Sequence, residues 1–513
     1  MRIHLEAFKG IAPRIEPHRL ADNAAQQAQN CLLDSGSIRP LKDASFVASP
    51  TKAGTIKSLF KYGEFWFNWI NDVSCLRSPT NDTEDMVVFT GEGVPKLTYA
   101  SIATAGGDYP SASYELGTPI PTTAPAATVA GAASGDDPTD RTYFVTFICT
   151  YAGLQFEGAP SDPSNRVTVN PGQSVNVTLP STPAGNYIFT HKVIYRTVGD
   201  TIRRMATVAH TATDWTDTYE TGDLGVDLVT DNWYPPPDDL TGLVSLPGGV
   251  MAGISGKQVC FSVPYQPHAW PPDWRRIARD TPVALGAFGN TLVVLTDGQP
   301  EVGVGTSDPE NLFLERVEMD QACIAPRAVV DLGYVVAFPS PDGLFLVGQG
   351  VTRNATEQIF RKEQWQPPVF GAAHDEKYFG FRESGGFIFD PRTGDWTEHD
   401  ITATAAWRDP GTDMLYVATS DGIMQWEGGS AKTFVWKSKL FRVPPGSFAS
   451  IRVEGGPVTV THYQNGIESF SASIQDEVLR LPSGEMARKH EIKLEGNTTV
   501  DAVTIGSSVM EVR

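Results

Sequence analysis

Two pairs of adjacent carboxylates come nearest, by residue type and spacing, to groups that could do chemistry in this sequence. Asp136-Asp137 and Asp238-Asp239 could supply a general acid and a general base for glycoside hydrolysis, which needs two carboxylates fixed ~5–10 Å apart in a cleft. Each pair lies beside prolines in a turn-rich stretch, and such stretches are usually solvated. The sequence therefore favours exposed turns at both places, and we predict no catalytic residue there.

Ser-Asp-Gly turns are a second candidate for sugar chemistry. The stretches Ser340–Gly343 and Ser420–Gly422, the latter followed by Trp426, approach the Ser-x-Asp-x-Gly-x-x-Trp turn of sialidase blades without matching it. An Asp-Gly pair beside a serine is also expected in an ordinary hairpin turn. The sequence contains no Walker loop, HExxH or GxSxG, and no GxGxxG after an apolar strand, so the motif-bearing enzymes are excluded. We expect a protein that is not an enzyme.

The spacing of the His, Cys and acidic residues does not indicate a metal site or a redox-active cysteine pair. The nine histidines form no metal-ligand spacing with another His, Cys or acid, so we predict no metal and no cofactor. The cysteines are odd in number, lie in apolar runs and form no CxxC or CxxH motif, which predicts buried free thiols. They are Cys31, Cys75, Cys149, Cys260 and Cys323.

Composition indicates a turn-rich, all-β globular protein of several domains. The chain has 513 residues, 41% of them hydrophobic, with 48 Gly and 38 Pro, which argues against disorder. Its 40 Lys and Arg against 60 Asp and Glu give a net charge of −20, whereas a sequence-independent DNA binder needs a cationic surface. The N-terminus has no apolar signal region, and no long apolar run occurs, so we expect neither secretion nor a membrane span.

One pattern recurs five times between residues 243 and 430. A strand of small apolar residues is followed by a turn, a heavier apolar strand, a second turn and a third strand that opens on glycine. The middle residues of the small strands are 35, 42, 43 and 33 positions apart, and meanders that repeat every ~40–45 residues are typical of β-propeller blades. Small residues suit inner strands, which crowd around the propeller axis. The small strands are Met251–Gly253, Gly286–Phe288, Ala328–Val330, Gly371–Ala373 and Thr404–Ala406.

A sixth round lies apart from the other five. Residues 56–100 contain four apolar runs with turn residues between them, so they predict one four-stranded blade. We therefore predict an all-β fold with a six-bladed β-propeller, formed by a first blade in residues 51–100 and five blades in residues 238–430. The four expected strands are Ile56–Tyr62, Phe65–Trp69, Asp85–Thr90 and Lys96–Tyr99.

The remaining stretches predict a linker, an insert and two ends. Residues 101–137 are rich in Ala, Gly, Thr, Ser and Pro, as in an extended linker. Residues 138–237 predict a separate β-sandwich. In residues 431–513 apolar and polar residues alternate, which predicts a small β-sandwich or platform with one buried face. Residues 1–50 form an N-terminal arm, in which Ala21–Leu32 permits a helix.

The insert and the arm resemble known families. The order Tyr143–Phe147, Glu157–Ser161 and Val193–Thr197 resembles a fibronectin type III domain.

The arm is similar to the amino-terminal signature of the tail nozzle proteins of short-tailed bacteriophages, also called tail tubular protein B. Four further stretches resemble the same family: residues 246–253, 261–271, 295–300 and 340–344. The signature residues are Phe8-Lys9-Gly10, Leu20, Gln27, Asn30, Gly36 and Ile38-Arg39-Pro40.

The nozzle resemblance implies a structural virion protein at the distal end of a short tail. It implies a homo-hexameric ring around a DNA channel, docked on the tail adaptor and assembled in the host cytoplasm. An acidic lumen would let DNA pass without specific binding, the insert would meet fibres or the host surface, and contact with the host membrane would be at most transient. The alternative is a receptor-binding or glycan-cleaving propeller on a tail appendage.

The arm and the alternating C-terminal strands are the parts that we expect to contact the adaptor and neighbouring subunits. The predicted assembly interface consists of Phe8, Lys9, Gly10, Asn30, Gly36, Arg39, Pro40, Trp436, Lys437 and Lys439.

Overall fold

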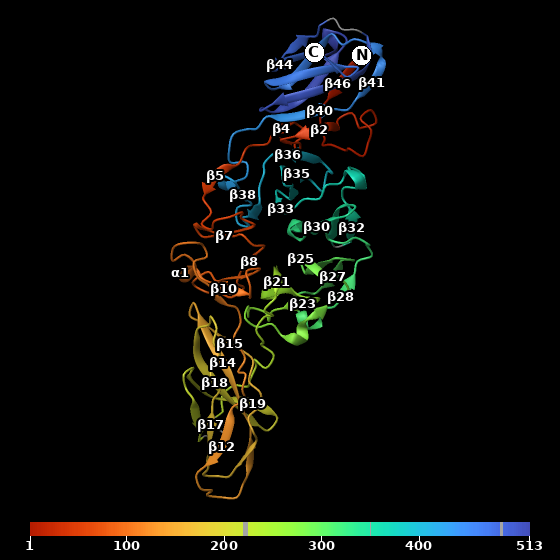
Figure 1. Ribbon diagram of the computed structural model, residues 1–513. Coiled ribbons are helices and arrows are strands. Elements are labelled where there is room, and N and C mark those ends of the chain that lie inside the picture. The colour runs from red at the N-terminus through yellow and green to blue at the C-terminus, as the bar shows by residue number, and fades with distance from the viewer. Residues whose placement is uncertain (219–223, 349, 483–485, 513) are drawn as a thin grey trace. The chain divides into compact units, whose positions relative to one another are not determined.

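The structure is a computed structural model that describes residues 1–218, 224–348, 350–482 and 486–512. Over these residues the chain is nearly all-β, built from many small antiparallel sheets (Figure 1), so the predicted all-β class is confirmed. The described α-helix, α1 (Ala100–Ala103), has four residues. The chain divides into two compact units: unit 1 holds residues 1–70, 295–300 and 317–513, and unit 2 holds residues 71–294 and 301–316.

Each of the five predicted rounds coincides with four neighbouring antiparallel strands, which form a separate four-stranded sheet in every round except the one that begins at Gly371, where they are part of a ten-stranded sheet. Three of these sheets lie in unit 1, and an N-terminal strand, β5 (Ser45–Ala48), supplies the fourth strand of the last one by pairing with β39. Their other strands are β29 (Val330–Asp331), β30 (Val335–Ser340), β31 (Gly343–Gly348) and β32 (Val351–Asn354); β33 (Phe370–His374), β34 (Lys377–Phe381), β35 (Gly386–Phe389) and β36 (Trp396–His399); and β37 (Ala405–Arg408), β38 (Leu415–Thr419) and β39 (Gly422–Gln425).

The other two rounds belong mainly to unit 2. In the first of them the small strand, Met251–Gly253, lies in the second strand of its sheet, because an additional strand, β21, precedes it. The strands are β21 (Thr241–Leu246), β22 (Val250–Ser255), β23 (Gln258–Phe261) and β24 (Arg276–Ile277), and then β25 (Pro282–Phe288), β26 (Thr291–Thr296), β27 (Glu301–Val304) and β28 (Leu314–Arg316).

The predicted blade at residues 56–100 differs from the structure, which forms two sheets there. β6 (Ser58–Tyr62) and β7 (Phe65–Trp69) form a two-stranded sheet in unit 1, and four further strands form a separate sheet in unit 2. Two strands of the second sheet were not predicted because neither lies in an apolar run. β8 contains polar Ser74 and Arg77, and β11 falls in the predicted linker. That sheet consists of β8 (Ser74–Arg77), β9 (Val87–Thr90), β10 (Lys96–Thr98) and β11 (Tyr114–Glu115).

The insert, in unit 2, consists of short sheets around an apolar core in which Tyr143, Phe147 and Val177 are fully buried. At one end of the insert, Tyr151 and Phe156 belong to a second buried cluster, which they share with residues outside the insert. Its first strand, β12, lies in the stretch that the sequence analysis assigned to the linker. The sheets are β15 (Leu154–Glu157), β14 (Tyr143–Tyr151), β18 (Phe189–Val198) and β19 (Thr201–Ala209); β12 (Ala126–Ala130), β17 (Ser174–Thr178) and β20 (Asp214–Asp217); and β13 (Thr139–Arg141) with β16 (Val167–Val169).

The C-terminal residues form two sheets that share one apolar core, which we call the C-terminal sandwich. Val453 and Ile505 of one sheet and Val460 and Leu494 of the other belong to the same buried cluster. The N-terminal strand β1 is an edge strand of this domain. The sheets are β1 (Arg2–Leu5), β47 (Val500–Gly506), β42 (Ser450–Gly455) and β45 (Val478–Arg480), and β40 (Phe434–Ser438), β41 (Phe441–Gly446), β46 (Ala487–Gly496), β43 (Val458–Gln464) and β44 (Ile467–Ile474).

The helix permitted at Ala21–Leu32 is wrong. This stretch contains the strands β2 (Ala25–Gln29) and β3 (Cys31–Leu32), and β3 pairs with β4 (Arg39–Pro40). β2 pairs antiparallel with β40 and also pairs, in parallel, with β36, so it joins strands β33–β36 to the C-terminal sandwich in one continuous sheet (Figure 1). Two ready-made sheet edges override a weak local preference for helix.

Candidate assembly site

The residues predicted for the assembly interface all lie in unit 1, around the place where β2 passes between β36 and β40. We call this place the joint and define it by Phe8–Gly10, Asn30, Asp395–Asp400 and Trp436. The N-terminal arm enters the joint before β2 and leaves it through the turn that contains Gly36. The structure thus brings together residues that lie more than 400 positions apart in the sequence.

Two buried aromatic rings form the centre of the joint. Phe8 is 1% exposed and Trp436 is fully buried, and their rings meet edge to face with centroids 4.9 Å apart. The indole nitrogen Nε1 of Trp436 donates a hydrogen bond of 3.1 Å to the carbonyl of Lys9. The amide of Phe8 donates to the carbonyl of Gly36 at 2.8 Å, and Gly36 has a left-handed φ of 84°. The predicted residues Phe8, Gly36 and Trp436 therefore hold the arm in place.

Gly10 brings the arm backbone against the backbone of β36. A Cβ atom at this position would lie 2.3 Å from the carbonyl oxygen of Trp396, so only glycine fits. The amide of Gly10 donates to Oδ1 of Asp395 at 3.1 Å, and Nζ of Lys9 forms an ion pair with Oδ2 of the same carboxylate at 3.1 Å. The carboxylate that precedes β36 thus binds two predicted arm residues.

Asn30 connects the end of β2 to the end of β36. Its side chain donates to Oδ2 of Asp400 at 3.1 Å and accepts a hydrogen bond from the amide of Asp400 at 3.2 Å. Burial would raise the pKa of Asp400, but hydrogen bonds from Asn30 and Lys432 outweigh that effect, and the pKa lies below its ordinary value. Asn30 is buried and has a left-handed φ of 53°, a conformation that asparagine tolerates better than most residues.

The remaining predicted cations are also engaged within the chain. Nζ of Lys437 lies 2.9 Å from Glu491, and Nζ of Lys439 lies 2.9 Å from Asp22. Arg39 forms an ion pair with Asp34 at 2.7 Å, and the adjacent Pro40 pairs with Cys31 in the short β3–β4 sheet. Among the predicted residues with charged side chains, Lys9 and Arg39 remain the most exposed, at 43% and 45%.

The acidic residues that bind the arm were not predicted from the sequence. Asp395, Asp400 and Glu491 lie hundreds of positions from Lys9, Asn30 and Gln26, to which they bind. No local motif marks them, because an acid in a turn or on a strand has the same sequence appearance whether it is solvated or paired. Their function is visible only in the folded chain.

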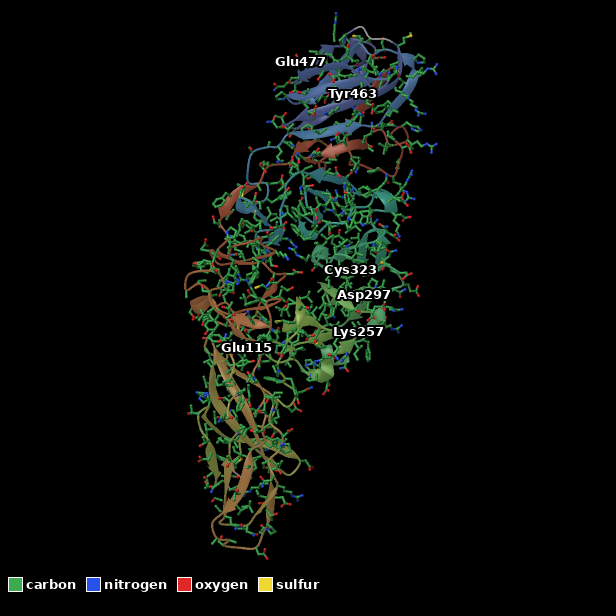
Figure 2. All side chains as sticks on the ribbon, viewed as in Figure 1. Glu115, Lys257, Asp297, Cys323, Tyr463 and Glu477 are labelled. Carbon is green, nitrogen blue, oxygen red and sulfur yellow. The ribbon has the colours of Figure 1, made fainter. Side chains whose placement is uncertain are left out.

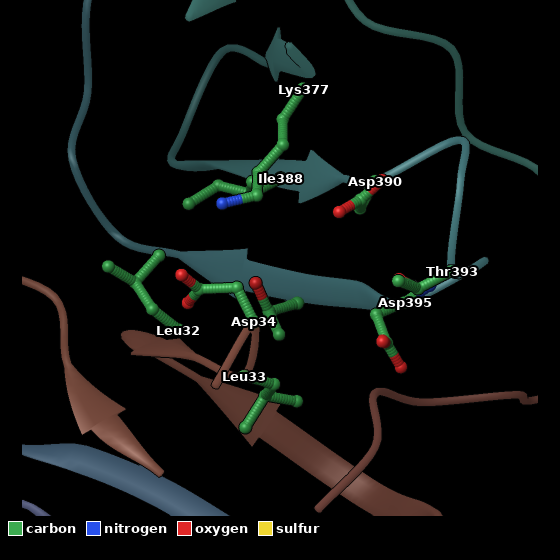
Figure 3. Close-up of a pocket in the computed structure, with 9 residues that line it drawn as sticks. Leu32, Leu33, Asp34, Lys377, Ile388, Asp390, Thr393 and Asp395 are labelled. Carbon is green, nitrogen blue, oxygen red and sulfur yellow. The ribbon is translucent and has the colours of Figure 1, made fainter. Parts of the chain in front are cut away.

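A pocket beside the joint gathers several charged side chains, and they form ion pairs within the chain. Figure 3 shows Asp34, Asp390, Asp395 and Lys377 around it. Asp34 binds Arg39, Asp390 binds Arg392, and Lys377 binds Asp375 at 2.7 Å. Within the described ranges no group of three or more His, Cys, Asp and Glu side chains has a geometry that could hold a metal ion. The charged groups that line this pocket therefore serve contacts within the chain.

The other candidate residues lie in exposed loops, in hairpin turns and in mostly buried thiols of the two units. Asp136-Asp137 and Asp238-Asp239 are exposed, as expected for turns. The two Ser-Asp-Gly stretches form the β30–β31 and β38–β39 hairpins. The cysteines are free thiols, four of them buried and Cys75 half-buried, and burial raises the pKa of Cys260 to about 11. No described helix has the length and apolar character that crossing a membrane requires.

Comparisons with known proteins add no identity. No family model matches the chain, and no curated protein matches it. Among solved structures, the chain is similar to apo AztD from Citrobacter koseri (TM-score 0.30, 11% identity, covering 69% of this chain and 99% of that chain). It is also similar to PorZ of Porphyromonas gingivalis (TM-score 0.27, 9% identity, 89% and 82%) and to the extracellular domain of BT3049 from B. thetaiotaomicron (TM-score 0.31, 11% identity, 81% and 43%). Likenesses of this size carry no argument about function.

Proposed function

We propose that this chain is a structural protein of a bacteriophage virion, the nozzle at the distal end of a short tail. The observation that carries this proposal is the joint. The arm residues by which the sequence resembles the nozzle family, Phe8 to Gly10 and Asn30 above all, converge on one buried place and bind a blade and the C-terminal sandwich. A resemblance made of scattered chance matches would not be expected to converge in this way.

The finer architecture that we propose is a six-bladed β-propeller with a fibronectin III-like insert and a C-terminal sandwich. Its support is the row of small antiparallel sheets and the pairing of β5 with β39. In that pairing a strand from the start of the chain completes the last sheet of the repeat, which is a way to join the two ends of a meander repeat. Many short strands that pair with one another leave few free edges and give a stiff body.

In this proposal the protein works by shape and charge. The stiff body forms one part of a ring, and the joint fixes the C-terminal sandwich to a blade so that both move together. A chain with a net charge of −20 repels phosphates, so DNA passes a ring of such chains without adsorbing to it. The partners are other copies of the chain and the tail adaptor, and the insert is the part that meets fibres or the host surface.

The test is assembly on the neighbouring tail protein. The purified chain is mixed with the tail adaptor of the same phage, and the particle mass and the images of negatively stained particles are compared with those of each protein alone. We expect a ring of several copies on the adaptor. A chain that stays monomeric in the mixture, or that cleaves host-surface glycans in a parallel assay, would refute the nozzle function.

The insert provides a second, independent test. Because most of its strands pack on a core formed within the insert, deletion of residues 126–237 should leave ring assembly on the adaptor intact. A deletion variant that folds, as judged by its circular dichroism, and still fails to assemble would show that the insert belongs to the ring contacts.

A further inference from the structure

The C-terminal sandwich contains a basic run in an acidic protein. Between Glu427 and Glu454 the chain has five Lys and Arg residues and no Asp or Glu. Four of the five form ion pairs within unit 1, and Arg442 has no acid at ion-pair distance among the described residues. The four pairs are Lys432–Asp400, Lys437–Glu491, Lys439–Asp22 and Arg452–Glu454.

Arg442 lies in a small cluster of cations at one end of the sandwich. It is directly opposite Lys489 in the pairing of β41 with β46, and like charges in that arrangement repel each other. The arm adds Arg19, because the amide of Leu440 donates to the carbonyl of Pro17 at 2.9 Å and so fixes the adjoining loop beside β41. All three side chains are exposed and lack an ion pair within the described ranges. We call Arg19, Arg442 and Lys489 the basic corner.

A titratable neighbour reports the same positive field. The pKa of His18 is lowered by burial and, after burial, by the charges of Arg442 and Arg19. Glu16 acts in the opposite direction and does not reverse the shift. The electrostatic potential at the basic corner is therefore positive, because the nearby acid Glu16 does not neutralise the two arginines.

The opposite end of the same sheet carries an acidic turn. β46 runs from Lys489, at the basic corner, to Gly496, which pairs with Val458 at the start of β43. Ile474 at the end of β44 pairs with Val458 from the other side, and Asp476-Glu477 follows after one residue. Figure 2 shows Glu477 on the side of the sandwich away from the place where Figure 1 labels β41.

The acidic turn is held in shape and its outer carboxylate is free to bind. Oδ1 of Asp476 accepts a hydrogen bond of 2.8 Å from the amide of Gly455, and Asp476 has a left-handed φ of 45°. Glu477 is exposed and has no cation at ion-pair distance in the described part of the chain. One domain thus presents uncompensated charges of opposite sign at its two ends.

We propose that the basic corner of one copy binds the acidic turn, Asp476-Glu477, of a second copy of this chain. Such a head-to-tail contact joins two different surfaces of neighbouring copies. It generates a closed ring when repeating the same rotation from copy to copy returns to the first copy. Complementary charges fix the register and speed the encounter. This inference rests on the proposed ring and names the contact that holds neighbouring copies in it. Three cations on a chain of net charge −20 suit an acidic protein surface better than duplex DNA, whose binding requires many phosphate contacts.

The test is an exchange of charges across the contact. Arg442→Glu and Glu477→Arg are made singly and together in the full-length chain, and ring assembly on the tail adaptor is measured by sedimentation at low and at high salt. Each single variant places like charges face to face, so the protein concentration for half assembly should rise about tenfold or more at low salt. In the double variant opposite charges face each other again, so assembly should recover to within about threefold of the unchanged chain.

The matched control is Lys257→Glu, which reverses an exposed cation in unit 2 (Figure 2) that forms no ion pair with a described residue. This variant should assemble like the unchanged chain. Single variants that assemble normally, or a double variant that does not recover, would overturn the proposal. If Arg442→Glu alone fails, the corner binds another acidic partner and the second copy is the wrong occupant.

The two proposals fail in different ways. If the unchanged chain forms no ring on the adaptor, the nozzle function is refuted, and the head-to-tail contact is then judged by sedimentation of the chain alone at low salt. Absence of concentration-dependent association there would refute the contact as well. If the ring forms equally well with all variants, the nozzle function stands and the contact is wrong.

Discussion

Gly10→Ala is the sharpest single test of the joint. The new Cβ atom would lie 2.3 Å from the oxygen and 2.5 Å from the nitrogen of Trp396, which are backbone atoms of β36 and cannot rotate away. The arm must therefore move outward. That movement breaks the hydrogen bond from Ile11 to the carbonyl of Trp396, at 3.0 Å, and the bond from the Gly10 amide to Asp395, at 3.1 Å.

The magnitude follows from these two bonds. A neutral backbone bond contributes about 1 kcal/mol and a bond to a carboxylate about 1.5–3 kcal/mol. The lower chain entropy of alanine in the unfolded state offsets up to about 1 kcal/mol of this loss. With the full offset, the expected net loss in the free energy of local opening is about 1.5–3 kcal/mol, which is a factor of roughly 10 to 150 in the opening equilibrium.

The assay is native-state hydrogen exchange, which measures local opening separately from global unfolding. The amides of Ile11 and Ala25, which donate to Trp396 and Gly10, should lose protection by that factor. Gly411→Ala is the control in the same unit, because a Cβ there meets only Oδ1 of Asp409, at 3.5 Å. Unchanged protection of Ile11 in Gly10→Ala would refute the tight approach of the arm to β36.

Two further predictions concern the insert and the C-terminal sandwich. Asp217 is fully buried and accepts bonds of 2.7 Å from Arg196 and from the hydroxyl of Tyr143, so Asp217→Ala, which removes this carboxylate from a buried ion pair, should cost about 3–5 kcal/mol; a urea midpoint for the insert unchanged from the wild type would contradict this. In the sandwich, burial and then the neighbouring His490 lower the pKa of His462 from 6.5 to about 4. Between pH 4 and 6.5 the unfolded chain therefore binds more protons at His462 than the folded chain does. The free energy of unfolding should fall as the pH drops from 6.5 towards 4. His462→Gln should flatten that dependence in denaturation curves, and an unchanged slope would show that His462 is not the group responsible.

Part of this molecule could be predicted from local pattern. Small-residue strands, Asp-Gly turns and heavier strands at near-regular spacing predict antiparallel sheets, because side-chain period and turn geometry are local properties. The strands of each of the five rounds between residues 243 and 430 pair antiparallel with one another. The same logic failed at Ala21–Leu32, where short polar and small residues have no strong local preference and the edges of β36 and β40 decide the outcome.

The sequence by itself determined that the chain is rich in strands and acidic. It also singled out Phe8–Gly10 and Trp436 as residues that make contacts. Tertiary structure alone decided what those residues do. Phe8 and Trp436 face each other, Gly10 lies against Trp396, and Lys9 meets Asp395, contacts that span hundreds of positions. The physical reason is that burial and ion pairing depend on which distant segments fold side by side, and no spacing along the chain records that information.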